Sequence, residues 1–381
     1  METKGDTKPL LDVKNLKVDY SAANGVVHAV NDVSFTLQRG EILGLAGESG
    51  CGKSTMAYAI TRLLRPPGYM TGGQILYHVP EGRDIPIIHR DTEDALLAEG
   101  TIDLMDLSPT QLRRFRWNEL SIVFQSAMNA LNPVLSIGAQ IIDVLKRHRP
   151  ELSAEQRKHR ALELLNLVGI ASDRLSSYPH QLSGGMRQRA VIAIALALNP
   201  ELIVMDEPTT ALDVVVQRDI LQLISALCKE FSMALIFITH DLSLLLELAD
   251  RVAIMYAGKI VELASCQELY LRPNHPYSYG LLNAFPNLHG PRRVMGGIPG
   301  SPPDLRNVPA GCAFHPRCLM AFEACRKVEP ILQAVHPGEH AEQGGLVSCH
   351  LYDKRYHKDD VAGSEAIAAR YATLAEEGKI R

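Results

Sequence analysis

Residues 47–54 read Gly-Glu-Ser-Gly-Cys-Gly-Lys-Ser and match the pattern G-x-x-x-x-G-K-[ST] in full. The apolar segment 41–46 (EILGLA) precedes them, and a helical pattern over residues 53–64 follows. A short buried strand, a glycine-rich loop and a helix in this order form a phosphate-binding unit. The glycines let backbone N–H groups converge on phosphate oxygens, and the helix N-terminus adds partial positive charge. The feature therefore predicts an α/β core that binds a nucleotide through its phosphates.

The side chains of this loop have distinct expected roles. Lys53 is expected to make a charge-assisted bond to the β- and γ-phosphates of ATP, and the Ser54 hydroxyl is a candidate Mg²⁺ ligand. The residues that we expect to hold the nucleotide here are Ser49, Gly50, Cys51, Gly52, Lys53, Ser54 and Thr55.

A second motif lies at residues 202–206, where an apolar strand pattern (LIVM) ends in Asp206 and is followed at once by Glu207. Asp206 at the end of such a strand can hold the water shell of Mg²⁺, which leaves Glu207 to orient and deprotonate the attacking water. An ordinary pair of exposed acids is the alternative. Beside a phosphate loop, the catalytic interpretation is favoured.

The rest of the chain has a clear order of patterns. Alternating apolar residues over 10–20 and 26–37, with Asn24-Gly25 between them, predict an antiparallel β-layer. The polar, acidic stretch 79–107 is interpreted as a surface insertion without an assigned function. Farther on, helix patterns over residues 137–148, 153–168 and 214–231 and strand patterns over residues 202–205 and 234–239 follow. Their alternation predicts a mostly parallel sheet that is covered by helices. Frequent prolines after residue 265 predict a loop-rich C-terminal module.

Charge and hydropathy exclude several classes of function for this chain. The net charge of −4 argues against nucleic acid as a partner, since such binders need a positive field. Two short stretches are basic, namely Arg113, Arg114, Arg116 and Lys146, Arg147, Arg149. We interpret them as solvated helix faces, with contact to anionic lipid or a membrane partner as the alternative. Residues 1–9 are polar and exclude a secretory h-region. The longest apolar run, 190–198, has about half the length of a membrane span.

Segment 178–189 (YPHQLSGGMRQR) resembles the signature segment of ABC ATPases. Three further residues match that family in order and spacing, namely Gln125 after Ile-Val-Phe, Asp213 after Thr-Ala-Leu, and His240 after the strand pattern 235–239. The resemblance covers residues 10–262. It implies an ABC ATPase nucleotide-binding domain at 1–264 of P-loop NTPase fold, with an antiparallel β-subdomain and a helical subdomain at about 126–182.

The resemblance also implies roles for these residues. Ser183, Gly184 and Gly185 would approach the γ-phosphate across the interface of a head-to-tail dimer, and Asp213 belongs to the nucleotide-binding set. His240 would contact the γ-phosphate or Glu207, and Gln125 would touch Mg²⁺ and sense a membrane partner. Tyr20 is a candidate to stack on adenine, with an ordinary strand aromatic as the alternative.

Segments 274–282, 297–305 and 311–318 resemble the C-terminal extension of ATPase subunits from oligopeptide/dipeptide importers, which implies a second domain at 265–381. The family implies a second, homologous ABC ATPase subunit, two transmembrane permease subunits and an extracellular substrate-binding protein, at the cytoplasmic face of the membrane. Di- or oligopeptides are the expected cargo, with nickel, opines or oligosaccharides as alternatives within the family. A soluble ABC ATPase acting on nucleic acid or ribosomes is the alternative from another class, but it would have paired nucleotide domains or a basic surface.

Four cysteines lie near the C-terminus with the spacing C-x₅-C-x₆-C-x₂₃-C, namely Cys312, Cys318, Cys325 and Cys349. In a reducing compartment such a group favours a metal site over disulfides, and both zinc and an iron–sulfur cluster suit four thiolates. The spacing does not decide between them. The family resemblance implies a structural [4Fe–4S] cluster; Zn²⁺, with His315 or His350 replacing one cysteine, and unligated thiols are the alternatives.

Overall fold

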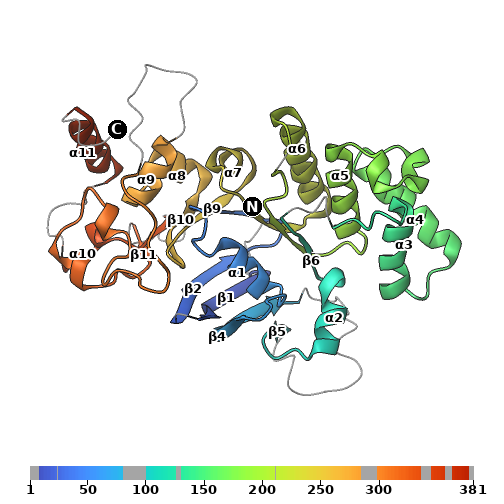
Figure 1. Cartoon of the computed structure of the whole chain (residues 1–381), viewed down its shortest axis with the longest axis horizontal. Coiled ribbons are helices and arrows are strands. Elements are labelled where there is room, and N and C mark those ends of the chain that lie inside the picture. Colours follow the sequence, from blue (N-terminus) through green and yellow to red (C-terminus); the bar gives the residue numbers. More distant parts are fainter. Residues whose placement is uncertain are drawn as a thin grey trace, which may run out of the picture.

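The computed structural model describes residues 8–23, 25–79, 100–125, 130–210, 212–284, 298–335, 345–356 and 363–376. Two sheets stand at its centre, with helices on both sides and at both ends (Figure 1). The larger sheet has the strand order β11-β12-β10-β9-β3-β8-β7-β6. Its strands are β11 Gln333–Ala334, β12 Leu346–Val347, β10 Lys259–Ser265, β9 Arg251–Tyr256, β3 Ile42–Ala46, β8 Ala234–Ile238, β7 Leu202–Asp206 and β6 Leu120–Val123.

The larger sheet is parallel from β9 to β6 and antiparallel from β9 to β11. The parallel strands β3, β7 and β8 are buried along their whole length, which explains their continuous apolar sequence. The expected mostly parallel, covered sheet is therefore confirmed. Because β3 and β7 run in the same direction on either side of β8, the phosphate loop and Asp206 both lie at the carboxyl edge of the sheet.

The smaller sheet is antiparallel with the order β2-β1-β4-β5, and its strands are β1 Leu11–Ala22, β2 Gly25–Leu37, β4 Gly68–His78 and β5 Thr101–Asp103. The predicted pairing of the first two segments is confirmed, with Leu11 opposite Leu37. The interpretation of 79–107 as an insertion is partly wrong. Residues 80–99 lie outside the described residues, but β5 pairs with β4 and buries Ile102 in the core, so the end of this stretch belongs to the sheet.

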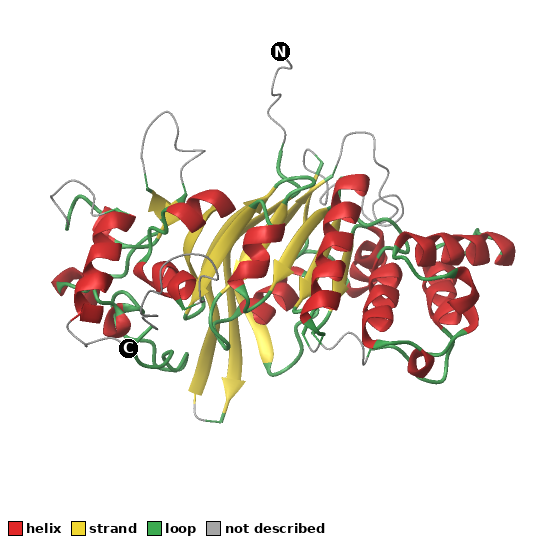
Figure 2. Ribbon diagram, turned by 90° about the horizontal axis from the view of Figure 1, so that it is seen from above, coloured by secondary structure: helices red, strands yellow, loops and turns green. Residues whose placement is uncertain are grey.

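Alternate residues of the large sheet face two cores. Leu202 and Val204 of β7 contact the core that contains the smaller sheet and α1 Lys53–Ile60. Ile203 and Met205 point to the opposite core, which is closed by α5 Gly184–Ala195, α6 Val214–Phe231 and α7 Leu242–Leu248. Figure 2 shows the strands between these helices. Helix α1 ends at Ile60, earlier than the predicted 64, because Arg62 takes a left-handed backbone conformation with φ 54°.

A helical segment extends from one end of the molecule (Figure 1). It contains α3 Ile137–His148, α4 Ala154–Leu167 and two short 3₁₀ turns, η2 Ser172–Ser176 and η3 Pro179–Gln181. A capping box begins α4, because the Ser153 hydroxyl accepts from Gln156 N and the Gln156 side chain accepts from Ser153 N. Within the described residues, no helix combines the length and the apolar character that crossing a membrane would require.

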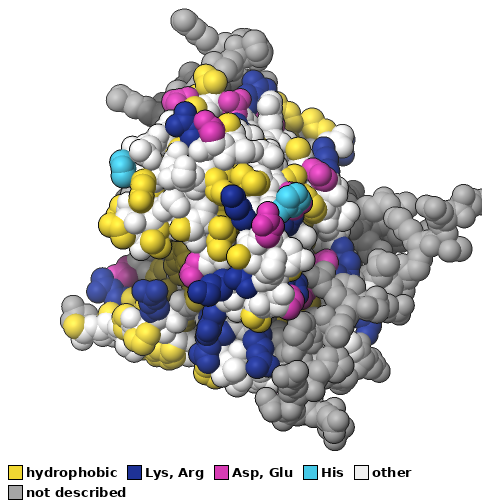
Figure 3. Space-filling view, turned by 90° about the vertical axis from the view of Figure 1, so that its right-hand side faces the viewer, with side chains coloured by type: hydrophobic (Ala, Val, Ile, Leu, Met, Phe, Trp, Pro, Cys, Tyr) yellow, Lys and Arg dark blue, Asp and Glu magenta, His cyan; other side chains and the backbone are white. Residues whose placement is uncertain are grey.

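The end of the molecule seen in Figure 3 has no uniform charge, since Lys and Arg gather in one region while acidic and hydrophobic side chains lie beside it. Among the basic stretches, Arg113 and Arg147 are exposed, as expected of solvated faces. Arg116 of α2 Pro109–Asn118 differs, because its Nε donates to Thr61 O at 2.9 Å. This arginine therefore holds the end of α1 against α2.

The C-terminal part is built onto the edge of the large sheet. Its strand β12 pairs with β10, with Val347 opposite Glu262. Its other elements are α8 Cys266–Leu271, α9 Pro276–Asn283, η4 His315–Arg317, α10 Glu323–Lys327, η5 His350–Tyr352 and α11 Ser364–Glu376. Helix α11 packs on α9, where the Tyr371 hydroxyl donates to Pro276 O at 3.2 Å. The part of the chain after residue 265 is rich in loops, as expected. Its strands β11 and β12, however, belong to the same large sheet as the strands of the nucleotide-binding part.

Candidate nucleotide site

The phosphate loop joins β3 to α1, and two of its glycines have no room for a side chain. Gly52 has φ +106°, and a Cβ there would lie 2.1 Å from the Ala29 carbonyl oxygen. Gly47 has φ +147°, and its Cβ would lie 2.3 Å from Met255 O. Lys53 is buried, and its Nζ donates to Gly47 O at 2.8 Å and to Glu48 O at 2.9 Å. The ammonium group is thus held inside the loop, where it can meet phosphate oxygens.

Asp206 and Ser54 form the part of the site that fits a divalent cation. The Ser54 hydroxyl donates to Asp206 Oδ1 at 3.0 Å. Asp206 is fully buried, and its Oδ2 has no hydrogen-bond partner of normal geometry among the described residues. Burial raises the pKa of this carboxyl, while the Ser54 hydrogen bond opposes the shift. A buried carboxylate beside a hydroxyl matches the hard oxygen ligands of Mg²⁺.

Glu207 stands at the centre of a hydrogen-bond network. Its Oε2 accepts from Gln125 Nε2 at 2.9 Å and from the Thr210 hydroxyl at 3.0 Å. Its Oε1 lies 3.2 Å from His240 Nδ1. The structure therefore brings together Gln125, Glu207 and His240. The resemblance implies a contact between His240 and Glu207, whereas the hydrogen bond from Gln125 was not expected. Thr210 was missed, although its place three residues after the acid was a usable signal.

Glu207 also has an unusual backbone. Its φ is +47°, and its N–H donates to Ile238 O at 2.9 Å on the neighbouring strand. A non-glycine residue in the left-handed region costs about 1–3 kcal/mol and persists where surrounding contacts fix it. The turn directs the carboxylate away from the end of β7 toward Gln125 and His240.

Tyr20 lies next to the phosphate-loop helix. Its hydroxyl is 3.3 Å from the Thr55 hydroxyl, across 35 residues of sequence. The ring packs closely on Gly68, where a Cβ would come within 2.7 Å of it. A half-buried aromatic ring is thus fixed beside the loop, at a place that suits stacking on a base.

The signature residues lie elsewhere. Ser183 is the N-cap of α5, and its hydroxyl accepts from Met186 N at 3.3 Å. Gly185 packs against α6, where a Cβ would lie 2.6 Å from Val216 Cγ1. Asp213 is the N-cap of α6 and accepts from Val216 N at 3.0 Å. In the described part of the chain, no hydrogen bond joins Ser183, Gly184, Gly185 or Asp213 to the phosphate loop, and α5 stands beside α6 rather than α1 (Figure 1).

The four C-terminal cysteines line one cavity of about 10 Å³, together with His315 and His350. All are free thiols. Burial, with a smaller contribution from the nearby thiols, raises the pKa of Cys312 to about 11 and that of Cys318 to about 12. The residues that sequence spacing grouped are therefore close in space. Across the described ranges, however, no group of three or more His, Cys, Asp or Glu side chains has an arrangement ready to hold a metal ion.

His350 adds a donor atom at this cavity. Its Nε2 is 2.8 Å from Val328 O, which fixes the proton on that nitrogen. Its buried Nδ1 then carries a lone pair and has no hydrogen-bond partner in the part of the chain that the structure describes. His315 differs, because its Nδ1 is 2.9 Å from Cys312 O.

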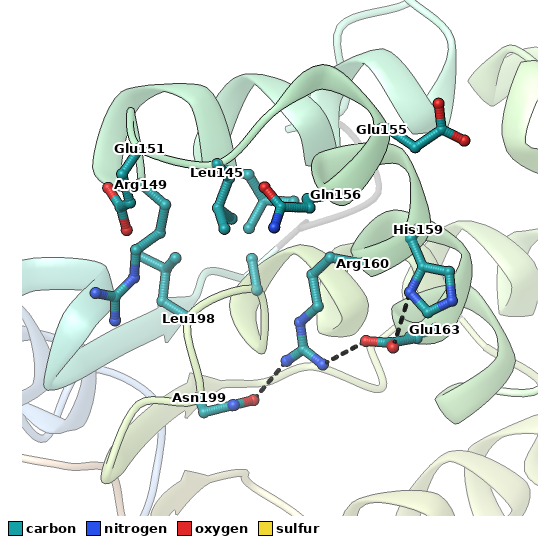
Figure 4. Close-up of a pocket in the computed structure, with 12 residues that line it drawn as sticks. Leu145, Arg149, Glu151, Glu155, Gln156, His159, Arg160, Glu163, Leu198 and Asn199 are labelled. Carbon is teal, nitrogen blue, oxygen red and sulfur yellow. Dashed lines mark hydrogen bonds and ion pairs between the residues drawn. The ribbon is translucent and has the colours of Figure 1, made fainter.

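A separate cavity of about 560 Å³ lies in the helical segment, between α3, α4 and the loop after α5 (Figure 4). Three of its charged or titratable side chains pair with one another. Arg160 contacts both Glu163 and Asn199, and His159 contacts Glu163. None of its lining residues belongs to the phosphate loop or the Glu207 network, so we assign it no part in nucleotide chemistry.

One contact of the phosphate loop was not expected from the sequence. Arg317, in η4, forms a two-pronged ion pair with Glu48, with Nη1–Oε2 at 2.6 Å and Nη2–Oε1 at 2.9 Å. Both residues stand in segments that were interpreted separately, one in the loop and one between two cysteines. A pairing across 269 residues leaves no local signal in one sequence.

Comparison with known proteins agrees with this site. Residues 30–210 match the family model "ABC transporter", and residues 261–325 match "Oligopeptide/dipeptide transporter, C-terminal region". The oligopeptide transport ATP-binding protein OppD of Bacillus subtilis is 44% identical, over 84% of this chain and 84% of its own. OppD of Haemophilus influenzae is 40% identical over 92% and 99%, and a putative peptide import ATP-binding protein of Brucella melitensis is 42% identical over 86% and 95%.

The fold of this chain is also similar to that of a solved ATP-binding cassette. The ATP-binding cassette MJ0796, in a dimeric post-hydrolysis state bound to ADP and Pi, superposes with a TM-score of 0.55 and 28% identity, over 67% of this chain and 98% of the other. The nucleotide-site geometry, both family models and relatives that match along most of their length agree. The chain belongs to the ABC transporter ATPases, in the group that carries the oligopeptide/dipeptide transporter C-terminal region.

Proposed function

We propose that this ATPase drives the import of di- or oligopeptides. The observation that carries the ATPase chemistry is the pair of acids after β7, with Asp206 beside Ser54 and Glu207 held by Gln125 and His240. Peptides are proposed as the cargo because the relatives named above are oligopeptide or peptide import proteins. Nickel and oligosaccharides are the alternative cargoes within the same group.

The proposed roles follow from the geometry. Backbone N–H groups of the loop and Lys53 bind the phosphates, while Ser54, Asp206 and Gln125 hold Mg²⁺, which neutralises charge on the phosphate oxygens. Glu207 accepts a proton from the attacking water as that water bonds to the γ-phosphorus. His240 orients Glu207 through Nδ1, at 3.2 Å. Tyr20 stacks on the adenine.

We further propose that the active unit is a pair of nucleotide-binding domains. Among the described residues, no hydrogen bond joins the phosphate loop to Ser183, Gly184 or Gly185. These three residues nevertheless form a helix N-terminus, which is suited to binding a phosphate. A second ATPase subunit, homologous to this chain, would present its own signature segment to this loop. The dimeric state of the structural neighbour MJ0796 supports this arrangement.

A groove of about 310 Å³ next to Gln125 is the proposed contact with a permease subunit. Its lining includes the apolar residues Leu63, Trp117 and Phe124 and the basic residues Arg113 and Arg147. A groove with apolar and basic lining residues fits a short cytoplasmic helix that has an apolar face and an acidic end. Two permease subunits and an extracellular substrate-binding protein complete the proposed importer, with this chain at the cytoplasmic face of the membrane.

The function is tested with the purified complex of this chain, its partner ATPase and the permeases in lipid vesicles. Phosphate release should rise when the binding protein is added with peptide and should stay at the basal rate with an oligosaccharide or Ni²⁺. Lys53→Ala serves as the inactive control. Stimulation by oligosaccharide or nickel alone would overturn the peptide assignment, and stimulation by RNA in the absence of permeases would overturn the transport assignment.

We propose that residues 265–381 form a second domain whose four cysteines hold a structural [4Fe–4S] cluster. Four thiols around one cavity, of which Cys325 and Cys349 are buried, are soft ligands, and a bound metal would supply the positive charge that lets them ionise. The present cavity, about 10 Å³, requires the side chains to reorient around such a group. Zinc with His350 is the alternative, supported by His350 Nδ1, which has no hydrogen-bond partner among the described residues.

The metal is identified by iron, sulfide and zinc analysis of protein purified without oxygen. Wild-type protein should be brown, and Cys312→Ser should lose both the colour and the iron. Cys266→Ser, a thiol outside the cavity, is the matched control and should stay brown. Colourless wild-type protein with one equivalent of zinc would replace the cluster by the zinc alternative.

A further inference from the structure

The phosphate loop contains a negative charge at the place where it must receive an anionic ligand. Glu48 is the second residue of the loop, and its backbone carbonyl accepts from Lys53 Nζ at 2.9 Å. Its side chain is 25% exposed, so water screens the carboxylate only partly. An unpaired carboxylate here would repel ATP and would lower the net positive charge that Lys53 gives to the loop.

Arg317 neutralises the negative charge of Glu48. The guanidinium covers both oxygens of Glu48, at 2.6 and 2.9 Å, and its Nε donates to Pro299 O at 2.7 Å. Only 6% of Arg317 is exposed. Bonding to Glu48 raises the pKa of the guanidinium further above its ordinary value, so Arg317 stays charged at any relevant pH. Such a two-pronged, largely buried pair fixes geometry as well as charge.

Aromatic side chains hold the pair in place. The guanidinium lies over the Tyr256 ring, 5.8 Å from its centre, and Tyr256 packs edge-on against Tyr277 and Phe314. The Tyr277 hydroxyl accepts from the backbone N–H of Glu48 at 2.9 Å. The carboxylate and the amide of Glu48 are therefore both bound by residues that follow β10.

We infer that Arg317 is a positioning residue for the nucleotide: it neutralises and holds Glu48, so that the affinity of the phosphate loop for ATP depends on the C-terminal part of the chain. The inference extends the ATPase function and concerns a residue outside the loop, the Asp206–Glu207 pair and the signature segment. Arg317 also stands in the single turn between Cys312 and Cys318, so the thiol cavity and the phosphate loop share one short support.

The test measures dissociation constants of MgATP and MgADP for the full chain. Arg317→Gln should weaken MgATP binding at least about tenfold, because it leaves a partly buried charge unpaired. MgADP, with fewer phosphate charges, should lose less. The double variant Glu48→Gln/Arg317→Gln should bind MgATP within about threefold of wild type, because the repelling charge is gone. Arg306→Gln is the matched control, since Arg306 forms a two-pronged pair with Asp304 at an exposed site.

The outcomes separate the explanations. The inference is overturned if Arg317→Gln binds MgATP within twofold of wild type, or if the double variant is as weak as the single one. Should Arg317→Gln fail to fold, Arg317→Lys takes its place: retained charge predicts binding within about threefold of wild type, and a loss of tenfold or more in a folded protein would refute the charge argument. Wild-type protein that binds no ATP would instead contradict the proposed function itself.

Discussion

Replacing Glu207 by Gln tests the catalytic chemistry with little structural change. The amide oxygen of Gln can accept the hydrogen bonds that Gln125 and Thr210 now give to Glu207 Oε2. Its NH₂ group can donate to His240 Nδ1, 3.2 Å from Oε1. Since all three contacts survive, ATP binding and thermal stability should stay near wild type. The loss should fall on proton transfer, about 10²- to 10⁴-fold in hydrolysis. This corresponds to about 3–5 kcal/mol of transition-state stabilisation.

The assay is phosphate release by the lipid-reconstituted complex, with ATP affinity measured on the same preparation. Thr210→Val is the matched control, because it removes one hydrogen bond to Glu207 and leaves the carboxylate. Its hydrolysis should fall by about tenfold at most, which corresponds to about 1.4 kcal/mol and lies within the net contribution of a typical single hydrogen bond. If Glu207→Gln hydrolyses ATP within tenfold of wild type, Glu207 is not the general base. If both variants fall equally, Glu207 acts through its position rather than through its charge.

Three further substitutions have defined outcomes. Gly52→Ala should abolish ATP binding, measured by titration with a fluorescent nucleotide, because its Cβ would lie 2.1 Å from Ala29 O. Tyr20→Ala should raise the KM for ATP about 5- to 100-fold while kcat changes little, if one stacking contact of about 1–3 kcal/mol is lost; an unchanged KM would show that the ring only packs on the fold. Burial raises the pKa of Glu262 to about 7 from 4.5, so the folded state binds the proton more tightly. The free energy of unfolding, measured by urea titration at each pH, should therefore fall by about 3 kcal/mol as pH rises from 4.5 to 7. Glu262→Gln should remove this pH dependence.

The nucleotide site was largely predictable because its information is local. A loop of eight residues between a buried strand and a helix fixes the positions of Lys53 and Ser54, and the end of β7, two strands along the sheet from β3, fixes Asp206. Patterns with the period of a helix were equally informative: α3 and α6 have the predicted bounds. In each case the signal lies within about twenty residues of the chain.

Contacts between distant segments were not predictable. The strand β5 is only three residues long, and its pairing with β4 depends on burying Ile102 against a core that the local sequence does not reveal. Likewise, β12 has two residues and forms only because β10 offers a free edge. The spacing of the four cysteines suggested proximity, which the shared cavity shows, but not which metal they would hold.

The pairing of β12 with β10 has a consequence for how this chain can be shortened. A protein that ended at Ser265 would keep every residue of the phosphate loop and the Asp206–Glu207 pair, yet it would lack the short strand that lies against Glu262 and Leu263. The outer N–H and C=O groups there would face solvent as an open template for other chains. Such a shortened ATPase should self-associate through this side and aggregate on concentration, even though its catalytic groups are intact.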